Sequence, residues 1–241
     1  IVLEDADLDS AIDAALWATF FHAGQACESG TRLFLPDTLH DDVVSKLVEK
    51  TKKIRLGDPS EMTSDMGPLI NQRQLDRVLG YIEKGKAEGA TVATGGKRAE
   101  GEGLEKGFYV EPTIFTGVTN DMAIAREEIF GPVLSVLRYK DVDEAIELAN
   151  QSSYGLGGAV WSRDTQAAWN VARRIRTGTV WINEYHMLNV QAPFGGYKES
   201  GLGREFGDEG LEAYTETKTI YLDLVGKREK KVWYDMIARR G

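Results

Sequence analysis

The sequence predicts an α/β protein, a layered sandwich built around a largely parallel β-sheet. Short apolar runs at 132–139, 156–161 and 178–183 have the length and apolar content of buried strands. Runs with apolar residues at helical spacing alternate with them, and parallel strands need such crossover helices. With 241 residues, the chain can form one large domain or two small ones.

The first predicted elements lead to a break in the chain at Gly24. Residues 1–8 have the pattern of a strand that runs into a helix, and Asp7 or Asp9 can cap that helix. Small side chains along the helix leave one face open for close packing. Gly24 ends the helix, and the apolar run 31–36 predicts the next strand.

The middle of the chain continues this alternation. Asp37 is expected to cap a second helix, and Asn71 opens a third with apolar residues on one face. Between them, residues 57–68 hold prolines and glycines and predict a surface loop. A short strand is expected at 90–94, followed by a polar, Gly-rich excursion at 97–107.

Strands dominate the second half of the prediction. Apolar runs at 108–110 and 113–115 are separated by Pro112, which is typical of an edge strand or a bulge. The run 132–139 is almost continuously apolar and predicts a strand buried on both faces. The remaining predicted elements are a helix at 141–150 capped by Asp141, a strand at 156–161, a helix at 165–175, a strand at 178–183, a short helix at 208–213, an exposed edge strand at 215–222 and a helix or partly ordered tail at 227–240.

The composition argues against several functional classes. A formal net charge of −9 disfavours nucleic acid as the main partner, because phosphate binding needs a basic face. No apolar run approaches the roughly 20 residues that span a bilayer, and no signal peptide is visible, so no membrane partner is expected. A single cysteine cannot form an intramolecular disulfide, which favours a cytoplasmic setting. This cysteine and three scattered histidines show no metal-ligand spacing.

That single cysteine, Cys27, is the strongest candidate for chemistry. It follows the helix break and is flanked by glycines, which let a substrate approach the backbone. Its own N–H can point at an oxyanion, and its thiolate is the reactive form. We therefore expect the surroundings to lower the thiol pKa and make Cys27 more reactive than a free thiol. The alternative is a small buried structural thiol, the usual fate of a free cysteine.

Four stretches together resemble the aldehyde dehydrogenase superfamily, in the order and at the separations typical of that family. The resemblance extends from residue 1 to about 224. The stretches are GQAC at 24–27, EEIFGPV at 127–133, PFGGYK at 193–198 and SGLGRE at 200–205.

The resemblance implies a domain organisation. Residues 1–214 correspond to the catalytic domain, 215–224 to an oligomerisation strand, and 225–241 to a tail without a family signal. In the family a dinucleotide-binding domain precedes this segment, together with the oxyanion asparagine and the general-base glutamate. The chain alone is therefore expected to be inactive, and the whole enzyme to be a homodimer or homotetramer.

The resemblance also implies a reaction with NAD or NADP as cofactor. Cys27 attacks a small-molecule aldehyde to give a thiohemiacetal, hydride passes to the nicotinamide, and the resulting thioester is hydrolysed to a carboxylic acid. Glu205 corresponds to a second glutamate that helps relay protons in some family members. Glu128 and Phe130 correspond to a pair that positions the cofactor, and Gln74 falls where the family often contacts the other ribose.

Ala26, Glu28 and Phe194 are implied to form the aldehyde pocket. Glu28 departs from the small or apolar residue common at its position. Pointing inward, a carboxylate would raise the thiol pKa. We therefore expect it to point away from Cys27 or to pair with Arg32.

Two other functions stay open at this stage. One is a cofactor-independent thiol esterase or acyltransferase built on Cys27, although the histidines offer no clear Cys–His dyad. The other is a non-catalytic dimerisation module that has kept the fold and lost the chemistry.

Overall fold

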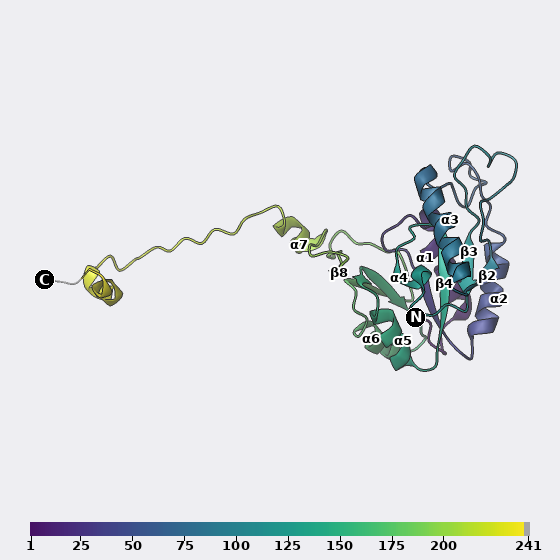
Figure 1. Cartoon of the computed structure of the whole chain (residues 1–241). Coiled ribbons are helices and arrows are strands. Elements are labelled where there is room, and N and C mark those ends of the chain that lie inside the picture. The colour runs from purple at the N-terminus through teal and green to yellow at the C-terminus, as the bar shows by residue number, and fades with distance from the viewer. Residues whose placement is uncertain (239–241) are drawn as a thin grey trace.

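The computed structural model describes residues 1–238 and confirms the α/β layered architecture (Figure 1). The strands are β1 (Arg32–Pro36), β2 (Thr91–Thr94), β3 (Thr113–Thr116), β4 (Val133–Tyr139), β5 (Tyr154–Gly155), β6 (Gly157–Val160), β7 (Thr179–Ile182) and β8 (Tyr197–Lys198). The main sheet has the order β1–β4–β3–β2. Its β1–β4 and β4–β3 pairs are parallel, and β2 is antiparallel to β3 at the edge. β6 and β7 form a second parallel pair, and β5 pairs antiparallel with β8.

The N-terminal segment lies between the two parallel sheets. Val2 N–H donates to the Phe34 carbonyl of β1 at 3.0 Å, and Val2 forms a parallel bridge with Trp161 just after β6. The start of the chain is thus extended as predicted, but it forms an isolated bridge and not a full strand. The Ile1 nitrogen is buried and donates to the Ala159 carbonyl at 2.8 Å.

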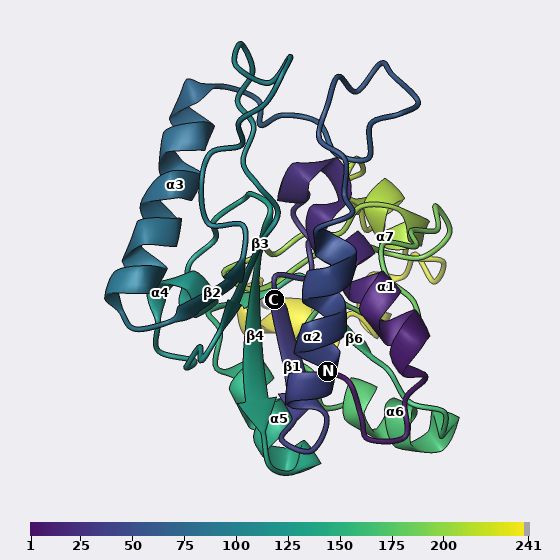
Figure 2. The same ribbon diagram turned by 90° about the vertical axis from the view of Figure 1, so that its right-hand side faces the viewer.

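Helices cover both faces of the main sheet (Figure 2). The helices of the described chain are α1 (Leu8–Phe20), α2 (His40–Thr51), α3 (Gln72–Ala87), α4 (Ala123–Arg126), α5 (Val142–Asn150), α6 (Thr165–Ala172) and α7 (Gly207–Glu212); α6 packs against β6 and β7, and α7 lies where the chain leaves the body. The caps predicted for three of them are present: Asp7, Asn71 and Asp141 each accept a hydrogen bond from a backbone N–H of the first turn.

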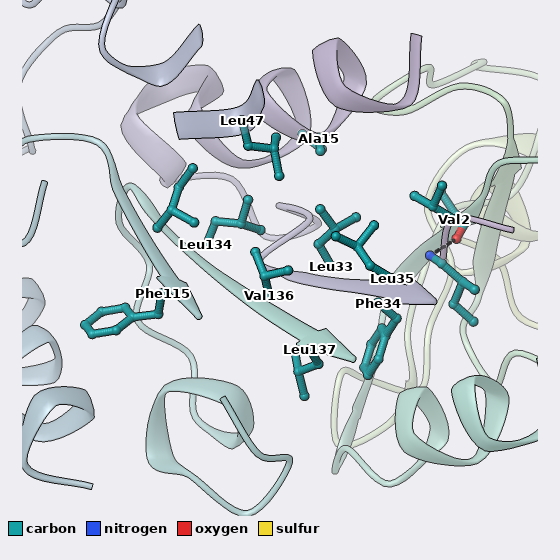
Figure 3. Close-up of a cluster of buried hydrophobic side chains, with 14 of the residues drawn as sticks. Val2, Ala15, Leu33, Phe34, Leu35, Leu47, Phe115, Leu134, Val136 and Leu137 are labelled. Atoms are coloured by element: carbon teal, nitrogen blue, oxygen red, sulfur yellow. Dashed lines mark hydrogen bonds between the residues drawn. The ribbon is translucent and has the colours of Figure 1, made fainter. Parts of the chain in front are cut away.

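The core forms where alternate side chains of β1 and β4 meet these helices. Leu33 and Leu35 of β1 point to one side of the sheet, toward Leu47 of α2, while Phe34 and Leu137 point to the other (Figure 3). All of them are at most 6% exposed. Because both faces are covered, these strands are apolar almost throughout, as the sequence predicted for 132–139.

Two local predictions were wrong. The second helix begins at His40 with Leu39 at its cap, so Asp37 does not cap it. Residues 108–110 do not form a strand: Val110 makes only an isolated bridge with Arg98. Pro112, which has no N–H to donate, follows directly and separates this segment from β3.

Beyond α7 the chain leaves the body as an extended arm (Figure 1). Residues 215–222 have no strand partner within residues 1–238, and Ile220 and Tyr221 are 80% and 94% exposed. Where the sequence predicted a helix or a partly ordered tail at 227–240, the structure has two short 3₁₀ turns, Arg228–Lys230 and Val232–Met236, and residues 239–240 lie outside the described part. Among the described residues, no helix is long and apolar enough to cross a membrane.

Candidate active site

Cys27 lies in a turn between α1 and β1, as the sequence predicts. After α1 ends at Phe20, the chain forms an irregular turn over Phe21–Gly24, in which His22 and Ala23 have positive φ angles of 51° and 55°. Such left-handed backbone is uncommon outside glycine and often occurs at functional sites. The Cys27 side chain that follows is exposed.

Two glycines bring the cysteine turn against the loop that carries Glu128 and Phe130. Gly24 has a φ of +69°, and a Cβ atom placed on it would lie 2.2 Å from the Gly131 carbonyl oxygen. A Cβ atom on Gly131 would lie 2.4 Å from a methyl group of Val78 on α3. A side chain on Gly24 would push the two loops apart, and one on Gly131 would push its loop away from α3.

The cysteine turn is also fastened to α1 and to the loop after β7. Gly30 N–H donates to the Ala18 carbonyl at 2.9 Å, and Thr19 Oγ1 donates to the Gly30 carbonyl at 2.8 Å. The Tyr185 hydroxyl donates to the backbone carbonyl of Glu28 at 2.8 Å. A Cβ atom on Gly30 would lie 2.8 Å from the Ala18 methyl group, so the small-residue face of α1 allows this contact.

A cavity of about 410 Å³ opens beside this turn. Five of the residues predicted from sequence lie on its wall: Ala26, Cys27, Glu28, Glu128 and Phe130. The wall also contains residues that the sequence did not single out for this cavity, among them Arg32, Tyr154, Trp161, Tyr185, Glu199 and Ser200. These residues come from separate segments, and no local pattern announces that the fold brings them together.

The Glu28 side chain points toward the thiol, which corrects the expectation that it points away. Cys27 Sγ donates to Glu28 Oε2 at 3.1 Å, and Glu28 Oε1 lies 3.0 Å from His186 Nδ1. Arg32, the other expected partner of Glu28, instead donates to Asn120 and to carbonyl oxygens at the end of α5. His186 is 158 residues from Glu28 along the chain, so sequence reasoning missed the cluster.

These contacts shift the pKa values of the thiol and the carboxylate in opposite directions. Partial desolvation of the sulfur, together with the hydrogen bond to Glu28 and its negative charge, raises the pKa of Cys27 to about 11. The hydrogen bond with His186 lowers the pKa of Glu28 to about 2. The prediction of a lowered thiol pKa is therefore wrong, because the charged group hydrogen-bonded to the sulfur is an anion.

The loop that carries Glu128 and Phe130 is braced from α3. Gln74 Nε2 donates to the carbonyls of Ile129 and Phe130 at 3.0 and 2.7 Å, and Arg77 donates to the Glu128 carbonyl. Gln74 lies off the cavity wall, and its predicted contact with the cofactor stays a prediction. The exposed Glu128 carboxylate has no hydrogen bond or ion pair with any group in residues 1–238.

Phe194 and Glu205 lie apart from this wall. Their backbones form an antiparallel bridge, with N–H···O distances of 2.7 Å in both directions. Phe194 is half-buried against the core, and Glu205 is exposed. The structure thus joins the PFGGYK and SGLGRE stretches to each other, while the pocket role of Phe194 and the relay role of Glu205 stay predictions.

The fold and the site define a class of protein: a layered α/β domain with a cysteine on a helix-to-strand turn, facing a cavity shared with an acidic and aromatic loop. A profile of the Aldehyde dehydrogenase family matches residues 1–220. The chain therefore belongs to the aldehyde dehydrogenase family.

Curated relatives include the betaine aldehyde dehydrogenase of Brucella anthropi, which is 51% identical over 224 residues, 93% of this chain and 46% of the relative. The betaine aldehyde dehydrogenase of Brucella melitensis is 50% identical with the same coverage. The chain thus spans about half the length of the curated relatives it matches.

Solved structures of aldehyde dehydrogenases also match most of this chain. An aldehyde dehydrogenase from Bacillus cereus in complex with NAD⁺ superposes with a TM-score of 0.89 and 48% identity, over 92% of this chain and 45% of that one. A betaine aldehyde dehydrogenase from Staphylococcus aureus in complex with NAD⁺ superposes with a TM-score of 0.87 and 45% identity, over 88% of this chain and 42% of that one.

Proposed function

We propose that this chain is the catalytic region of an NAD(P)-dependent aldehyde dehydrogenase that oxidises a small-molecule aldehyde to a carboxylic acid. The observation that carries the proposal is the shared cavity: Cys27, Glu128 and Phe130 come from distant stretches of the chain and line one wall. The close approach of Gly24 to Gly131 supports the same arrangement.

Cys27 is the nucleophile in this proposal. Once Sγ has lost its proton, it attacks the aldehyde carbon, and the carbonyl electron pair moves to oxygen to give a thiohemiacetal oxyanion. The Cys27 N–H can donate to that oxyanion. Water later attacks the thioester carbon, releasing the carboxylic acid and the free thiol.

Glu128 and Phe130 are proposed to hold the cofactor. The Glu128 carboxylate is exposed on the cavity wall and can accept two hydrogen bonds from ribose hydroxyls. The Phe130 ring, on the same wall, can pack against a nicotinamide face. A bound nicotinamide would supply the acceptor for the hydride that the reacting carbon must lose. The NAD⁺ complexes of the Bacillus cereus and Staphylococcus aureus proteins favour NAD, with NADP as the alternative.

The remaining site residues concern the aldehyde. Ala26 and Glu28 lie on the cavity wall next to Cys27, which supports their predicted place in the aldehyde pocket. Because the Brucella relatives are named for betaine aldehyde, this is the first substrate to test. The Glu28 carboxylate is already engaged by Cys27 and His186, so it does not offer a free anion to a cationic aldehyde.

The first prediction concerns whether the chain alone can oxidise an aldehyde. In the family, an upstream asparagine and glutamate complete the reaction, and losing one oxyanion donor costs about 100- to 1,000-fold in rate. We expect the purified 241-residue chain to form little NADH from betaine aldehyde. Joining the upstream part of the Brucella anthropi relative to residue 1 should restore NADH formation, measured by absorbance.

Cys27→Ser is the matched control for this chimera, because it removes the thiol and keeps the size and the turn. It should abolish the restored activity. Rapid NADH formation by the 241-residue chain alone would contradict the requirement for upstream residues. A folded chimera that remains inactive toward every aldehyde tried would contradict the catalytic proposal itself.

A cofactor-independent thiol esterase or acyltransferase is the second candidate, because the fold places His186 within the Cys27 cluster. In this cluster the carboxylate, not the imidazole, contacts the sulfur, and a carboxylate of such low pKa is a weak base. Turnover of a thioester by the chain without NAD⁺ would favour this candidate. If the chain neither binds NAD⁺ nor turns over an ester, the remaining candidate is the non-catalytic dimerisation module.

A further inference from the structure

Cys27, Glu28 and His186 form a continuous hydrogen-bonded chain that runs from the cavity wall toward α1. The Sγ–Oε2 distance is 3.1 Å, and the Oε1–Nδ1 distance is 3.0 Å. The side chains of Glu28 and His186 are only 11% and 5% exposed, so water has little access to their contact. Among residues 1–238, Oε2 of Glu28 has the Cys27 sulfur as its partner and Oε1 has His186.

His186 faces a hydrogen-bond acceptor at each ring nitrogen. Nδ1 faces the Glu28 carboxylate, and Nε2 lies 3.1 Å from the Ala18 carbonyl oxygen on α1. Both neighbours are acceptors, so the ring nitrogen that carries the proton donates to one of them. With the proton on Nδ1, the imidazole and the thiol each donate to the Glu28 carboxylate, through different oxygen atoms.

The backbone and neighbours of His186 hold the ring in this place. Its φ angle is +64°, a left-handed value that a non-glycine residue adopts only where the surroundings impose it. Its ring centroid lies 5.9, 5.3 and 5.0 Å from those of Trp17, Phe21 and Tyr185. Three aromatic rings and the contact with Glu28 thus fix one orientation of the imidazole.

Other ionisable groups near the cluster are engaged elsewhere or make no contact with it. Arg32 binds Asn120 and the end of α5, and the Tyr185 hydroxyl binds the backbone of Glu28 rather than its carboxylate. The remaining charged residues on the cavity wall are Arg126, Glu127, Glu128 and Glu199. None of these four has a hydrogen bond or ion pair with Cys27, Glu28 or His186 among the described residues.

We propose that Glu28 and His186 are positioning residues that hold the Cys27 nucleophile as a protonated thiol until a separate base removes its proton. His186 anchors Glu28, and Glu28 accepts the S–H hydrogen bond. This inference rests on the proposed role of Cys27 as nucleophile. It adds that the nucleophile is kept unreactive at rest by two residues that lie far apart in the chain.

The test uses the fact that Cys27 is the only cysteine. The rate of alkylation by iodoacetamide, followed by intact mass across pH, reports the thiolate fraction of this residue alone. We expect Glu28→Gln to lower the midpoint of the profile by about one unit, which is about tenfold faster alkylation at mildly alkaline pH. Glu102→Gln makes the same charge change in an exposed turn off the cavity wall and should leave the midpoint unchanged. A midpoint that Glu28→Gln leaves unmoved would overturn the proposal.

A second variant separates the roles of the two residues. His186→Ala removes the side chain that anchors Glu28 against the sulfur, so the midpoint should fall toward that of Glu28→Gln in the otherwise unchanged chain. In the Glu28→Gln background the same substitution should have no effect, because His186 acts through Glu28. Equal shifts in both backgrounds would overturn the positioning role of His186.

Two control measurements show whether a change in alkylation rate comes from the folded protein or from unfolding. Alkylation in concentrated urea should be equally fast for all variants, and urea unfolding curves show whether each variant is folded in buffer. Alkylation needs neither aldehyde nor cofactor. An unmoved alkylation midpoint would therefore contradict the role of Glu28 and His186 without contradicting the aldehyde dehydrogenase proposal. An inactive chimera would contradict the catalytic proposal without changing the alkylation result.

Discussion

At Gly24 the absence of a side chain sets how closely the cysteine turn approaches the loop before β4. Gly24→Ala would face both a positive φ of +69° and the Gly131 carbonyl oxygen at 2.2 Å. The backbone strain alone costs about 1–3 kcal/mol. We expect the free energy of unfolding, from urea titration, to fall by more than that, because one loop must also move.

Gly117→Ala is the control that separates strain from contact. Gly117 has a φ of +64°, and a Cβ atom on it would meet nothing within 4 Å. It should therefore show the strain cost alone. If both substitutions lower the stability equally, the Gly24–Gly131 contact does not hold the two loops together.

Residue-level prediction succeeded where the signal was local. Cys27 was placed correctly because Gly24 and the flanking apolar runs define its turn. The orientation of Glu28 was predicted wrongly, because it depends on His186, which only the fold brings into contact. A charged residue beside a nucleophile can have either orientation, and no spacing rule in the sequence distinguishes them.

At the scale of elements, α3 and the loop of Glu128 act as a unit through Gln74. The two hydrogen bonds from its amide to the loop carbonyls suggest a brace that works without any cofactor. We expect Gln74→Ala to lower the free energy of unfolding by about 1–2 kcal/mol in the absence of NAD⁺. Urea titration of the isolated chain measures this directly.

Gln72→Ala is the matched control, because the amide of Gln72 bonds only to Asp76 on the exposed surface of the same helix. It should cost a few tenths of a kcal/mol, as surface pairs on helices do. Unchanged stability for Gln74→Ala would show that its contacts with the loop are incidental. A role at the cofactor ribose alone would then be the better account of Gln74.

Most elements could be predicted because their signals are local. Asp7, Asn71 and Asp141 each cap the helix that follows, and the apolar run at 132–139 became β4. The start of α2 was misplaced, because an aspartate before a helical run need not supply the cap. The strand at 108–110 failed for a different reason: three apolar residues do not specify a pairing partner.

At the scale of the whole molecule, the arm after α7 (residues 215–224) is the segment that does not pack against the rest of the described chain. Its apolar side chains Ile220, Tyr221, Leu222 and Leu224 are each at least 77% exposed. Extended chain with free N–H and C=O groups is a template for pairing with another chain. We infer that residues 215–224 add to a sheet of a second copy, giving a closed oligomer in which each copy gives and receives one strand.

Removing residues 215–241 should therefore leave the urea midpoint of the body unchanged and lower the molar mass in light scattering to that of a monomer. Removing only residues 225–241 is the control, and it should keep the oligomer. If the longer truncation keeps the full oligomeric mass, the arm is not the element of assembly.

The buried nitrogen of Ile1 has a practical consequence for joining a segment ahead of it, as in the chimera proposed above. It donates to the Ala159 carbonyl of β6 at 2.8 Å, and a peptide N–H in its place can make the same hydrogen bond without a charge. The junction therefore lies against β6 inside the body, and the segment joined there has to leave the backbone of residues 1–3 in its present course.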